Sequence, residues 1–173
     1  MTIDPVKSIP TFYAGQSIFL TGATRFLGKV FIEKILRSCP DLDENLRGKQ
    51  SSNFKKLIPI FDDASEKGLG LSDTDRQMLI ERVTIIIHAA ASVKFDNSLK
   101  YAICVNTRST RDVCILAQSM KNLIALVYVS TAYAHVNNPV IEEKVYPSVI
   151  DWQKMIEMAE SLDEHTLNIL TAE

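Results

Sequence analysis

The sequence predicts an α/β fold with a doubly wound parallel sheet, and three observations carry this prediction. Short apolar runs that do not alternate with polar residues recur along the chain, as in strands covered on both faces. Segments with apolar residues at helical spacing separate these runs, which is the order of a sheet between two helix layers. A turn with two glycines joins the first run directly to the first helical segment.

Length and composition predict one globular domain of ordinary size, or part of a larger one. The chain has 173 residues, of which 46% are hydrophobic and 23% are charged, and its net charge is −2. It has no Lys/Arg cluster of the kind that binds nucleic acid, and no run fits a signal peptide or a membrane span. Three cysteines fit neither a zinc pattern nor a disulfide framework, so we expect an intracellular, reducing compartment and no metal site.

The first predicted strand, residues 17–21, leads into a glycine-bearing turn and a helix over 26–37. The turn reads Thr21-Gly22-Ala23-Thr24-Arg25-Phe26-Leu27-Gly28. Such a turn between a strand and a helix N-terminus is typical of pyrophosphate-binding loops. We therefore predict a partial NAD(P)-binding, Rossmann-like domain over 15–173, after an N-terminal segment 1–14. The alternative is an ordinary strand-to-helix turn.

Arg25 stands where a pyrophosphate-binding loop has its middle glycine. Its Cβ occupies space where phosphates approach the backbone closely, and its charge opposes the helix dipole by ~0.3–1 kcal/mol. We expect impaired cofactor binding as a result. The alternative is that the guanidinium swings out and pairs with a phosphate.

The region after the first predicted helix departs from the expected alternation of strands and helices. Residues 41–53 are polar, although a dinucleotide-binding fold places its second strand there, so we expect that strand to be missing. The next run, 57–61, is a weaker predicted strand because Pro59 has no N–H to donate. We expect it to pair directly with 17–21, since an unpaired buried edge is costly. Asp63, which follows it, is either an acceptor for an adenine amino group or a loop carboxylate.

A helix over 73–82, with Ser72 as its N-cap, precedes the third predicted strand at 83–88. His88 ends this strand, and we expect a packed histidine rather than a proton carrier. Ala89 to Ala91 follow, and such small residues leave room for a ligand at the carboxyl end of a parallel sheet.

The remaining pattern predicts a long helix over 99–120, a strand over 125–130 and two short helices over 152–159 and 164–170. Ser161 and Glu164 have the spacing of a capping box for the last helix. After the last strand, the hydroxyl of Ser130 or Thr131 could polarise a substrate carbonyl. The alternative for both is the polar end of a turn.

Five stretches of this chain, in order, resemble the cofactor domain of alcohol-forming fatty acyl-CoA reductases, which are extended short-chain dehydrogenase/reductase proteins. The resemblance covers residues 8–170, and generic epimerases lack its combination of KGLGLSDTDR, ASVKFD and STAYAHV. The stretches are TGATRFLGKVFIEKILRSCPDL, IPIFDDASEKGLGLSDTDR, IIIHAAASVKFD, VNTRSTRDV and LVYVSTAYAHVNNPVIEEKVYP.

The resemblance implies NADPH-dependent reduction of a long-chain fatty acyl-CoA to a primary alcohol, through a bound aldehyde. It implies Ser130 or Thr131 as the substrate-polarising hydroxyl, and family members associate with peroxisomal or ER membranes. The residues that it places at the cofactor are Thr21, Gly22, Ala23, Thr24, Arg25, Phe26, Leu27, Gly28, Asp63, Ala89, Ala90 and Asn106.

The chain also departs from the family pattern. Arg25 and the missing second strand weigh against NADPH binding, and none of the five tyrosines has the lysine four positions on that the Tyr-x-x-x-Lys pair requires. The chain resembles an N-terminal part of such a reductase with an internal deletion, without the part that binds substrate. We therefore expect no activity from this chain alone. The alternative is a non-catalytic, truncated isoform or interaction module that pairs, as a homo- or hetero-oligomer, with a full-length reductase.

Overall fold

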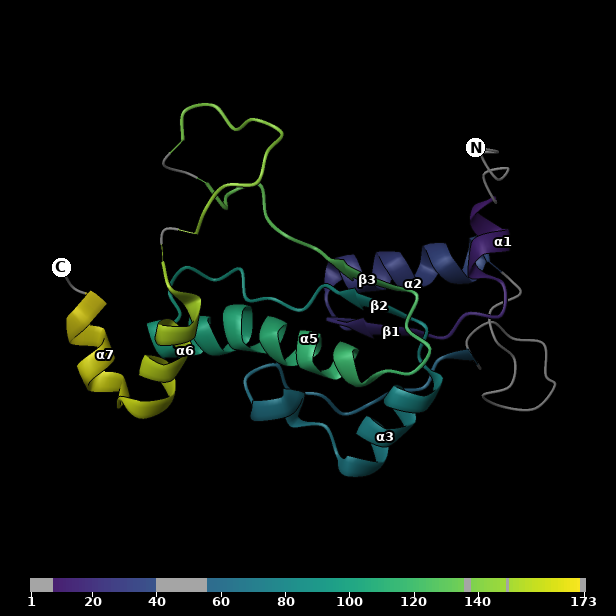
Figure 1. Cartoon of the computed structure of the whole chain (residues 1–173), viewed down its shortest axis with the longest axis horizontal. Helices are drawn as coiled ribbons and strands as arrows, with labels where there is room; N and C mark the ends of the chain where they lie inside the picture. Colours follow the sequence, from purple (N-terminus) through teal and green to yellow (C-terminus); the bar gives the residue numbers. More distant parts are fainter. Residues whose placement is uncertain (1–7, 40–55, 136–137, 149, 172–173) are drawn as a thin grey trace.

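The computed structural model describes residues 8–39, 56–135, 138–148 and 150–171. Its centre is a three-stranded parallel sheet in the order β1-β2-β3 (Figure 1). Thr21 pairs with His88, and His88 pairs with Tyr128, so all three strands end at the same level. The predicted α/β class and three of the four predicted strands are confirmed. The strands are β1 (Ile18–Thr21), β2 (Ile85–His88) and β3 (Ala125–Tyr128).

The predicted strand at 57–61 is wrong. These residues form no strand, and among the described residues β1 pairs with β2 alone. Pro59 interrupts the N–H donors that a regular ladder needs. Instead of pairing, Leu57, Ile58 and Ile60 line a cleft beside β1. The described part of the sheet is therefore incomplete, and residues 41–53, where we expect no strand, lie outside the described residues.

All five predicted helices are present, and one of them is interrupted. The predicted helix 99–120 contains a π-helical turn, η3, at its centre. The short helix α1 was not predicted; it begins after Ser8 and has Pro10 in its first turn, where a missing N–H costs little. The helices are α1 (Ile9–Tyr13), α2 (Phe26–Ser38), η2 (Lys67–Gly70), α3 (Asp73–Arg82), α4 (Leu99–Ala102), η3 (Ile103–Arg108), α5 (Ser109–Ser119), α6 (Trp152–Ser161) and α7 (Glu164–Thr171).

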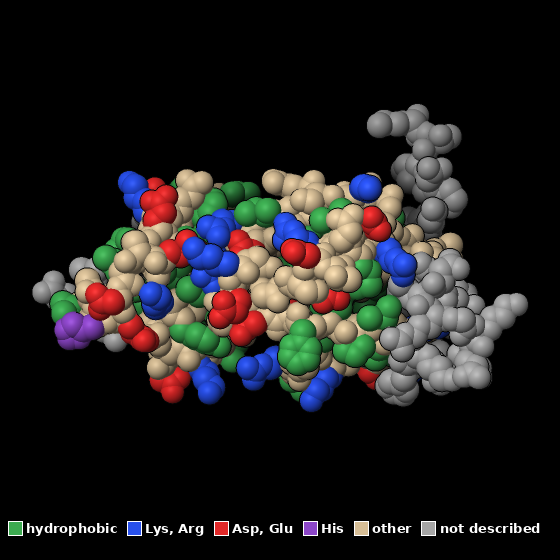
Figure 2. Space-filling view, turned by 90° about the horizontal axis from the view of Figure 1, so that it is seen from below, with side chains coloured by type: hydrophobic (Ala, Val, Ile, Leu, Met, Phe, Trp, Pro, Cys, Tyr) green, Lys and Arg blue, Asp and Glu red, His purple; other side chains and the backbone are tan. Residues whose placement is uncertain are grey.

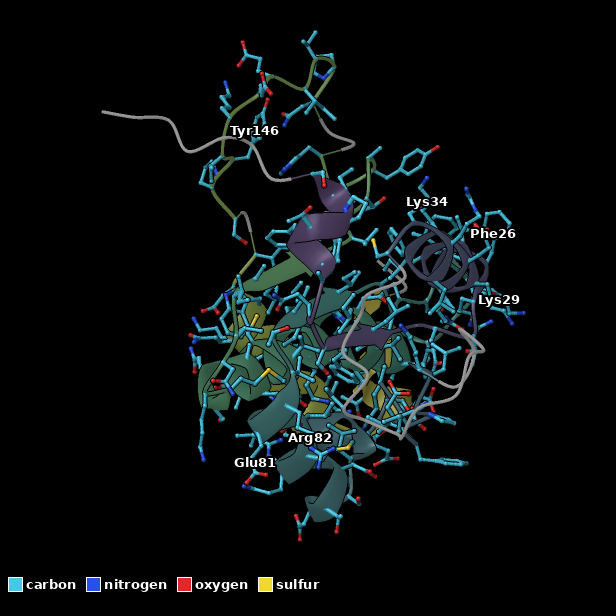
Figure 3. The ribbon with its side chains drawn as sticks, turned by 90° about the vertical axis from the view of Figure 1, so that its right-hand side faces the viewer. Phe26, Lys29, Lys34, Glu81, Arg82 and Tyr146 are labelled. Carbon is cyan, nitrogen blue, oxygen red and sulfur yellow. The ribbon has the colours of Figure 1, made fainter. Side chains whose placement is uncertain are left out.

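Helices cover both faces of the sheet, as predicted. In Figure 3, Phe26 and Lys29 on α2 lie on the opposite side of β1 from Glu81 and Arg82 on α3. Leu36 of α2 packs with Ile18 on one face. The other face carries the larger apolar core, which α3 and α5 contribute to. That core consists of Phe19, Leu69, Leu79, Val83, Ile86, Val113, Leu116 and Met120.

Caps define where three of the helices begin. The Ser72 hydroxyl accepts a hydrogen bond from the Asp75 N–H at 3.1 Å, which confirms the predicted N-cap of α3. The predicted capping box of α7 is wrong, because the Thr166 N–H donates to Asp163 at 2.9 Å, while the Ser161 hydroxyl bonds back within α6. Asp151 caps α6. Within the described ranges, no helix is long and apolar enough to cross a membrane.

Side-chain charge is mixed on the face that Figure 2 shows, which is seen from below the view of Figure 1. Lys and Arg side chains alternate with Asp and Glu over this face, and green apolar side chains lie between them. Among the described residues of this face, neither sign of charge forms an extended area.

Candidate functional site

The two glycines of the turn after β1 lie where no side chain fits. Gly22 has a φ of +74°, and a Cβ on it would lie 2.8 Å from the carbonyl carbon of Ala89 and from the nitrogen of Ala90. A Cβ on Gly28 would overlap the Gly22 carbonyl oxygen and lie 2.7 Å from Cα of Ala23. The turn is thus held between β2 and α2 by direct backbone packing. We call residues 22–28 the glycine turn.

Arg25 completes the glycine turn with its backbone. Its N–H donates to the Gly22 carbonyl at 3.1 Å, and its own carbonyl accepts from the Lys29 N–H at 3.0 Å. Its φ of −84° is ordinary for any residue, so the turn itself does not demand glycine at this position. The guanidinium is exposed, and among the described residues it has no hydrogen bond or ion pair. It remains available for a ligand.

A chain of hydrogen bonds joins the carboxyl ends of β1 and β2 to α5. The Thr21 hydroxyl accepts from the N–H groups of Ala89 and Ala90, both at 3.2 Å, so its proton goes to Nδ1 of His88 at 2.7 Å. Nε2 of His88 then donates to the Thr110 hydroxyl at 3.1 Å. The Thr110 hydroxyl in turn donates to the backbone carbonyl of Asn106 at 2.9 Å.

His88 is therefore a structural residue. It is fully buried, its ring stacks on Tyr128 at 5.5 Å, and both ring nitrogens have partners. Burial lowers the pKa of its imidazole, which keeps the ring neutral near pH 7. The expectation of a packed histidine is confirmed. Thr21 is likewise structural, because its buried hydroxyl bonds to His88 and to the backbone N–H groups of Ala89 and Ala90.

Asn106 uses its whole side-chain amide to hold the segment after β2. Its Oδ1 accepts from the Ser92 N–H at 2.8 Å, and its Nδ2 donates to the Ser92 carbonyl at 3.1 Å. Asn106 lies in the π-helical turn η3, and such turns are frequent at functional sites. The amide thereby fixes the backbone that continues from Ala89 and Ala90.

Asp63 closes a second turn, and we call residues 62–70 the acidic turn. Its Oδ1 accepts from the Ser65 N–H at 2.8 Å and from the Ser65 hydroxyl at 2.7 Å. These bonds lower the pKa of the Asp63 carboxyl, whereas partial desolvation raises that of Asp62. Oδ2 of Asp63 receives no hydrogen bond within the described part of the chain. Asp63 thus holds its own turn through Oδ1, and Oδ2 stays open for a ligand.

The predicted carbonyl-polarising residues follow β3. The Val129 N–H donates to the His88 carbonyl at 2.9 Å, so this segment starts beside the end of β2. Ser130 and Thr131 are exposed, and the Thr131 hydroxyl accepts from the Tyr133 N–H at 3.1 Å. They lie at the same edge of the sheet as the glycine turn, but they do not line the cleft that contains it.

One cleft of about 490 Å³ brings several predicted site residues together. It runs along the open side of β1, between the glycine turn and the acidic turn. Of the predicted residues, Gly22, Ala23, Thr24, Arg25, Asp63 and Ala90 line it. Those that do not are Thr21, Phe26, Leu27, Gly28, Ala89, Asn106, Ser130 and Thr131.

Sequence reasoning missed other residues of the cleft. Lys56 and Arg82 line it together with Arg25, so the described part of the lining carries three cations and the carboxylates of Asp62 and Asp63. Ser65 and Tyr101 also line it. Arg82 lies in the last turn of α3, and neither its spacing nor its neighbours in the sequence indicate a ligand.

Comparisons with known proteins support a nucleotide-binding origin. Residues 42–169 match an NAD-binding family described as Male sterility protein. The chain is 39% identical over 191 residues to fatty acyl-CoA reductase 1 of Pongo abelii, and 38% identical to that of Homo sapiens. It is 38% identical over 186 residues to the fatty acyl-CoA reductase wat of Drosophila melanogaster.

These matches cover nearly all of this chain and a minor part of each relative. They include 95% of the chain for the first two relatives and 92% for the third, but only 37% and 36% of the relatives' own lengths. The first two matches run over 191 residues, more than the 173 of the chain, so those relatives carry residues within the matched stretch that this chain lacks.

Two solved structures share the fold. The terminal R domain from the myxalamid PKS-NRPS biosynthetic pathway has a TM-score of 0.55 and 28% identity, over 68% of this chain and 35% of that one. The PhqB reductase domain from Penicillium fellutanum has a TM-score of 0.53 and 22% identity, over 85% and 43% respectively. Both support a Rossmann-like α/β architecture.

Proposed function

This chain belongs to the Male sterility protein family of NAD-binding domains, and on that premise we propose that its cleft binds NADPH for the reduction of a long-chain fatty acyl-CoA. The observation that carries the proposal is the close approach of Gly22 to Ala89 and Ala90, where a Cβ would lie 2.8 Å away. Pyrophosphate-binding turns have their first glycine at such a point, because it allows the tight turn that leads from the strand to the helix N-terminus.

The residues of the cleft fit a dinucleotide. The glycine turn leads into the N-terminus of α2, a helix of 13 residues whose dipole favours an anion. Small residues 90–92 form one side, and Oδ2 of Asp63 is open to accept from an adenine amino group. The guanidinium of Arg25 is free to pair with a phosphate, and we adopt this alternative over impaired binding.

The charge of the lining favours the phosphorylated form of the dinucleotide. Among the described residues, Arg25, Lys56 and Arg82 line the cleft together with the carboxylates of Asp62 and Asp63. An additional phosphate on the ribose adds negative charge that this lining attracts. Bound NADPH would supply a hydride, and the protein's part is to hold the nucleotide and to favour its phosphorylated form.

For the acyl substrate, we propose that the hydroxyl of Ser130 or Thr131 donates a hydrogen bond to the thioester carbonyl. In the reductase class that this chain resembles, a tyrosine with a lysine one helical turn away delivers the proton to that oxygen, and none of the five tyrosines of the sequence has such a lysine. Tyr146 lies far from the sheet in Figure 3, and Tyr128 stacks on the buried His88. We therefore propose that this chain alone binds nucleotide without turning over acyl-CoA.

Titration of the chain with NADPH, followed by nucleotide fluorescence, tests the proposal. We expect saturable binding, lost in Gly22→Ala and retained in Gly15→Ala. Gly15 is a matched control, because its φ of +70° imposes the same backbone strain while nothing lies within 4 Å of its Cβ position. Equal binding by the two variants would contradict the proposed site. Incubation with NADPH and a long-chain acyl-CoA should yield neither aldehyde nor alcohol above a boiled control.

One observation favours the alternative of a non-catalytic module that pairs with a full-length reductase. Leu126, Val127 and Tyr128 of β3 are 37%, 49% and 46% exposed, so an apolar strand borders solvent. Such an edge is a template for pairing with another chain. Light scattering of the chain, alone and mixed with a full-length reductase, tests this alternative; a strictly monomeric chain in both samples would exclude it.

A further inference from the structure

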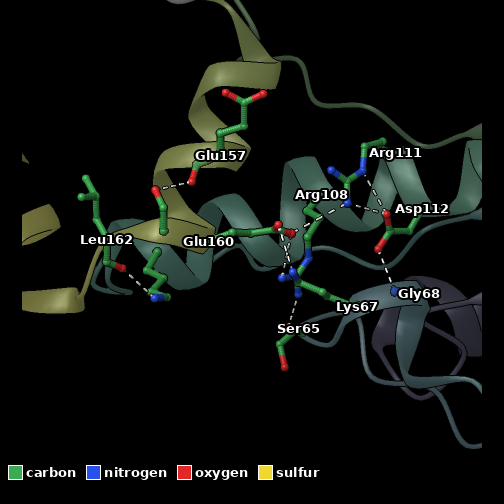
Figure 4. Close-up of polar contacts among 11 residues, drawn as sticks. Ser65, Lys67, Gly68, Arg108, Arg111, Asp112, Glu157, Glu160 and Leu162 are labelled. Carbon is green, nitrogen blue, oxygen red and sulfur yellow. Dashed lines mark hydrogen bonds and ion pairs between the residues drawn. The ribbon is translucent and has the colours of Figure 1, made fainter.

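A network of charged and polar groups joins α6 to the acidic turn (Figure 4). Glu160 of α6 accepts from Lys67 at 3.1 Å and lies 3.7 Å from Nη1 of Arg108. Nη2 of Arg108 donates to the backbone carbonyl of Ser65. The Ser65 N–H and hydroxyl both bond to Oδ1 of Asp63. A continuous path therefore leads from α6 to the side of the cleft that carries Asp63.

Arg108 is the central member of this path. It is 5% exposed and contacts both Ser65 and Glu160, and its Nε has no described partner. A buried guanidinium must be compensated, and here one carboxylate and one carbonyl do so. Its planar fork of N–H donors suits this double contact, whereas a lysine offers a single charged point.

A second set of contacts holds the far end of the acidic turn. Asp112 accepts from the Gly68 N–H at 2.9 Å and from Arg111 at 2.9 and 3.0 Å. Leu69, the next residue, has a φ of +68°, which a leucine rarely adopts, and its side chain is buried in the main core. Such backbone persists only where the surroundings impose it. The turn therefore depends on these contacts for its shape.

The π-helical turn η3 contacts both sides of the cleft. Asn106 holds Ser92 on one side, and Arg108, two residues later, holds Ser65 on the other. The same turn packs on α6, where Ile103 lies with Ile156 and Ala159. Helix α6 thus packs on η3, the turn that contacts both sides of the cleft. Glu160 is the charged residue through which α6 contacts the acidic turn.

We propose that Arg108 is a positioning residue, which together with Glu160 holds the acidic turn at the distance from residues 90–92 that the adenine end of the nucleotide requires. This inference rests on the proposed function of the cleft. It assigns α6, which contributes no residue to the cleft, a role in nucleotide affinity. A change that loosens the packing of α6 therefore also weakens the affinity of the cleft for nucleotide.

The test compares Glu160→Ala with Glu157→Ala in the full chain. Glu157 lies on the same helix, and among the described contacts its carboxylate has none, so the pair is matched in charge and helix propensity. Two quantities are measured. One is NADPH affinity, and the other is amide hydrogen exchange of residues 65–69 in the ligand-free chain. We expect Glu160→Ala to weaken affinity about three- to tenfold and to speed exchange in these residues, with Glu157→Ala unchanged.

Conservative variants separate positioning from general stability. Glu160→Gln keeps a hydrogen-bonding oxygen and should recover part of the affinity. Arg108→Lys keeps the charge but loses the fork, and it should weaken affinity even where the melting temperature stays that of the wild type. Wild-type affinity and exchange in Glu160→Ala would overturn the inference.

The two proposals fail in different ways. If the wild-type chain does not bind NADPH, the proposed function is wrong. The hydrogen-exchange comparison alone then tests whether α6 holds the acidic turn in place. Faster exchange of residues 65–69 in Glu160→Ala than in Glu157→Ala supports that role of α6, and equal exchange overturns it.

Discussion

The glycine turn and the acidic turn line the same cleft but are held by different forces. The glycine turn has no space for a Cβ at Gly22 or Gly28, and buried hydrogen bonds of Thr21 and His88 support it from below. The acidic turn is held by charged contacts that run from the interior to solvent: Arg108 and Asp112 are buried, whereas Glu160 is 26% exposed and Lys67 is 71% exposed. Close packing resists displacement, whereas ion pairs near solvent tolerate it. The glycine turn is therefore the rigid side of the cleft, and the acidic turn is the adjustable one.

The largest expected effect comes from filling the space at Gly28. In Gly28→Ala, the new Cβ overlaps the Gly22 carbonyl, and we expect the free energy of unfolding to fall by about 3 kcal/mol despite alanine's better helix propensity. Urea unfolding measures this loss of free energy. Gly15→Ala is the control, because it adds a methyl group at a position with open space. A loss no greater than that of Gly15→Ala would show that the glycine turn is not tightly packed.

Removal of the Asp112 carboxylate, which holds the acidic turn, should cost less stability. Asp112→Ala leaves the Gly68 N–H and Arg111 without their acceptor, and we expect a loss of about 2 kcal/mol in unfolding free energy. Asp112→Asn, which keeps an acceptor for the Gly68 N–H, should recover part of it. If both variants match the wild type in urea, charge does not hold this turn.

The two turns should also respond to different ranges of pH. Burial lowers the pKa of His88 below 6.5, so the unfolded chain binds the proton more readily, and stability that is present above pH 6.5 is lost as pH falls through the folded pKa. Asp63 and Glu160 have pKa values lowered from 3.8 and 4.5, so their contribution is lost only in stronger acid. We expect the melting temperature to fall between pH 7 and pH 5, with wild-type behaviour in His165→Gln, whose imidazole is exposed. A flat profile over this range would contradict the buried, neutral histidine.

The smallest expected effect concerns Arg25. Because its guanidinium is exposed, we expect Arg25→Gly and Arg25→Gln both to weaken NADPH affinity by about two- to fivefold, with a reduced dependence on salt. Tighter binding by Arg25→Gly alone would show that the Cβ obstructs the phosphates, as the sequence suggests. The comparison of the two variants thus separates charge from steric hindrance.

The strands and the glycine turn could be predicted because their signals are local. Ile85 to Ile87 form an uninterrupted apolar run, and Gly22 and Gly28 stand at the boundaries that a strand-to-helix turn requires. The run at 57–61 led to a wrong strand prediction, since its apolar residues line a cleft instead of pairing with β1. Within this run, Pro59 was the residue that spoke against a strand. Arg108 and Glu160 could not be paired from sequence, because 51 intervening positions carry no signal for a tertiary contact between them.

The most direct measurement is a titration of the isotope-labelled chain with NADPH, in which backbone amide resonances report where the nucleotide binds. The account predicts shifts in both turns, at Gly22, Ala23 and Ser65, and in the segment that ends at Ser92. It predicts none in α7. Shifts confined to residues 124–146, or no saturable shift at all, would contradict a nucleotide site between the glycine turn and the acidic turn.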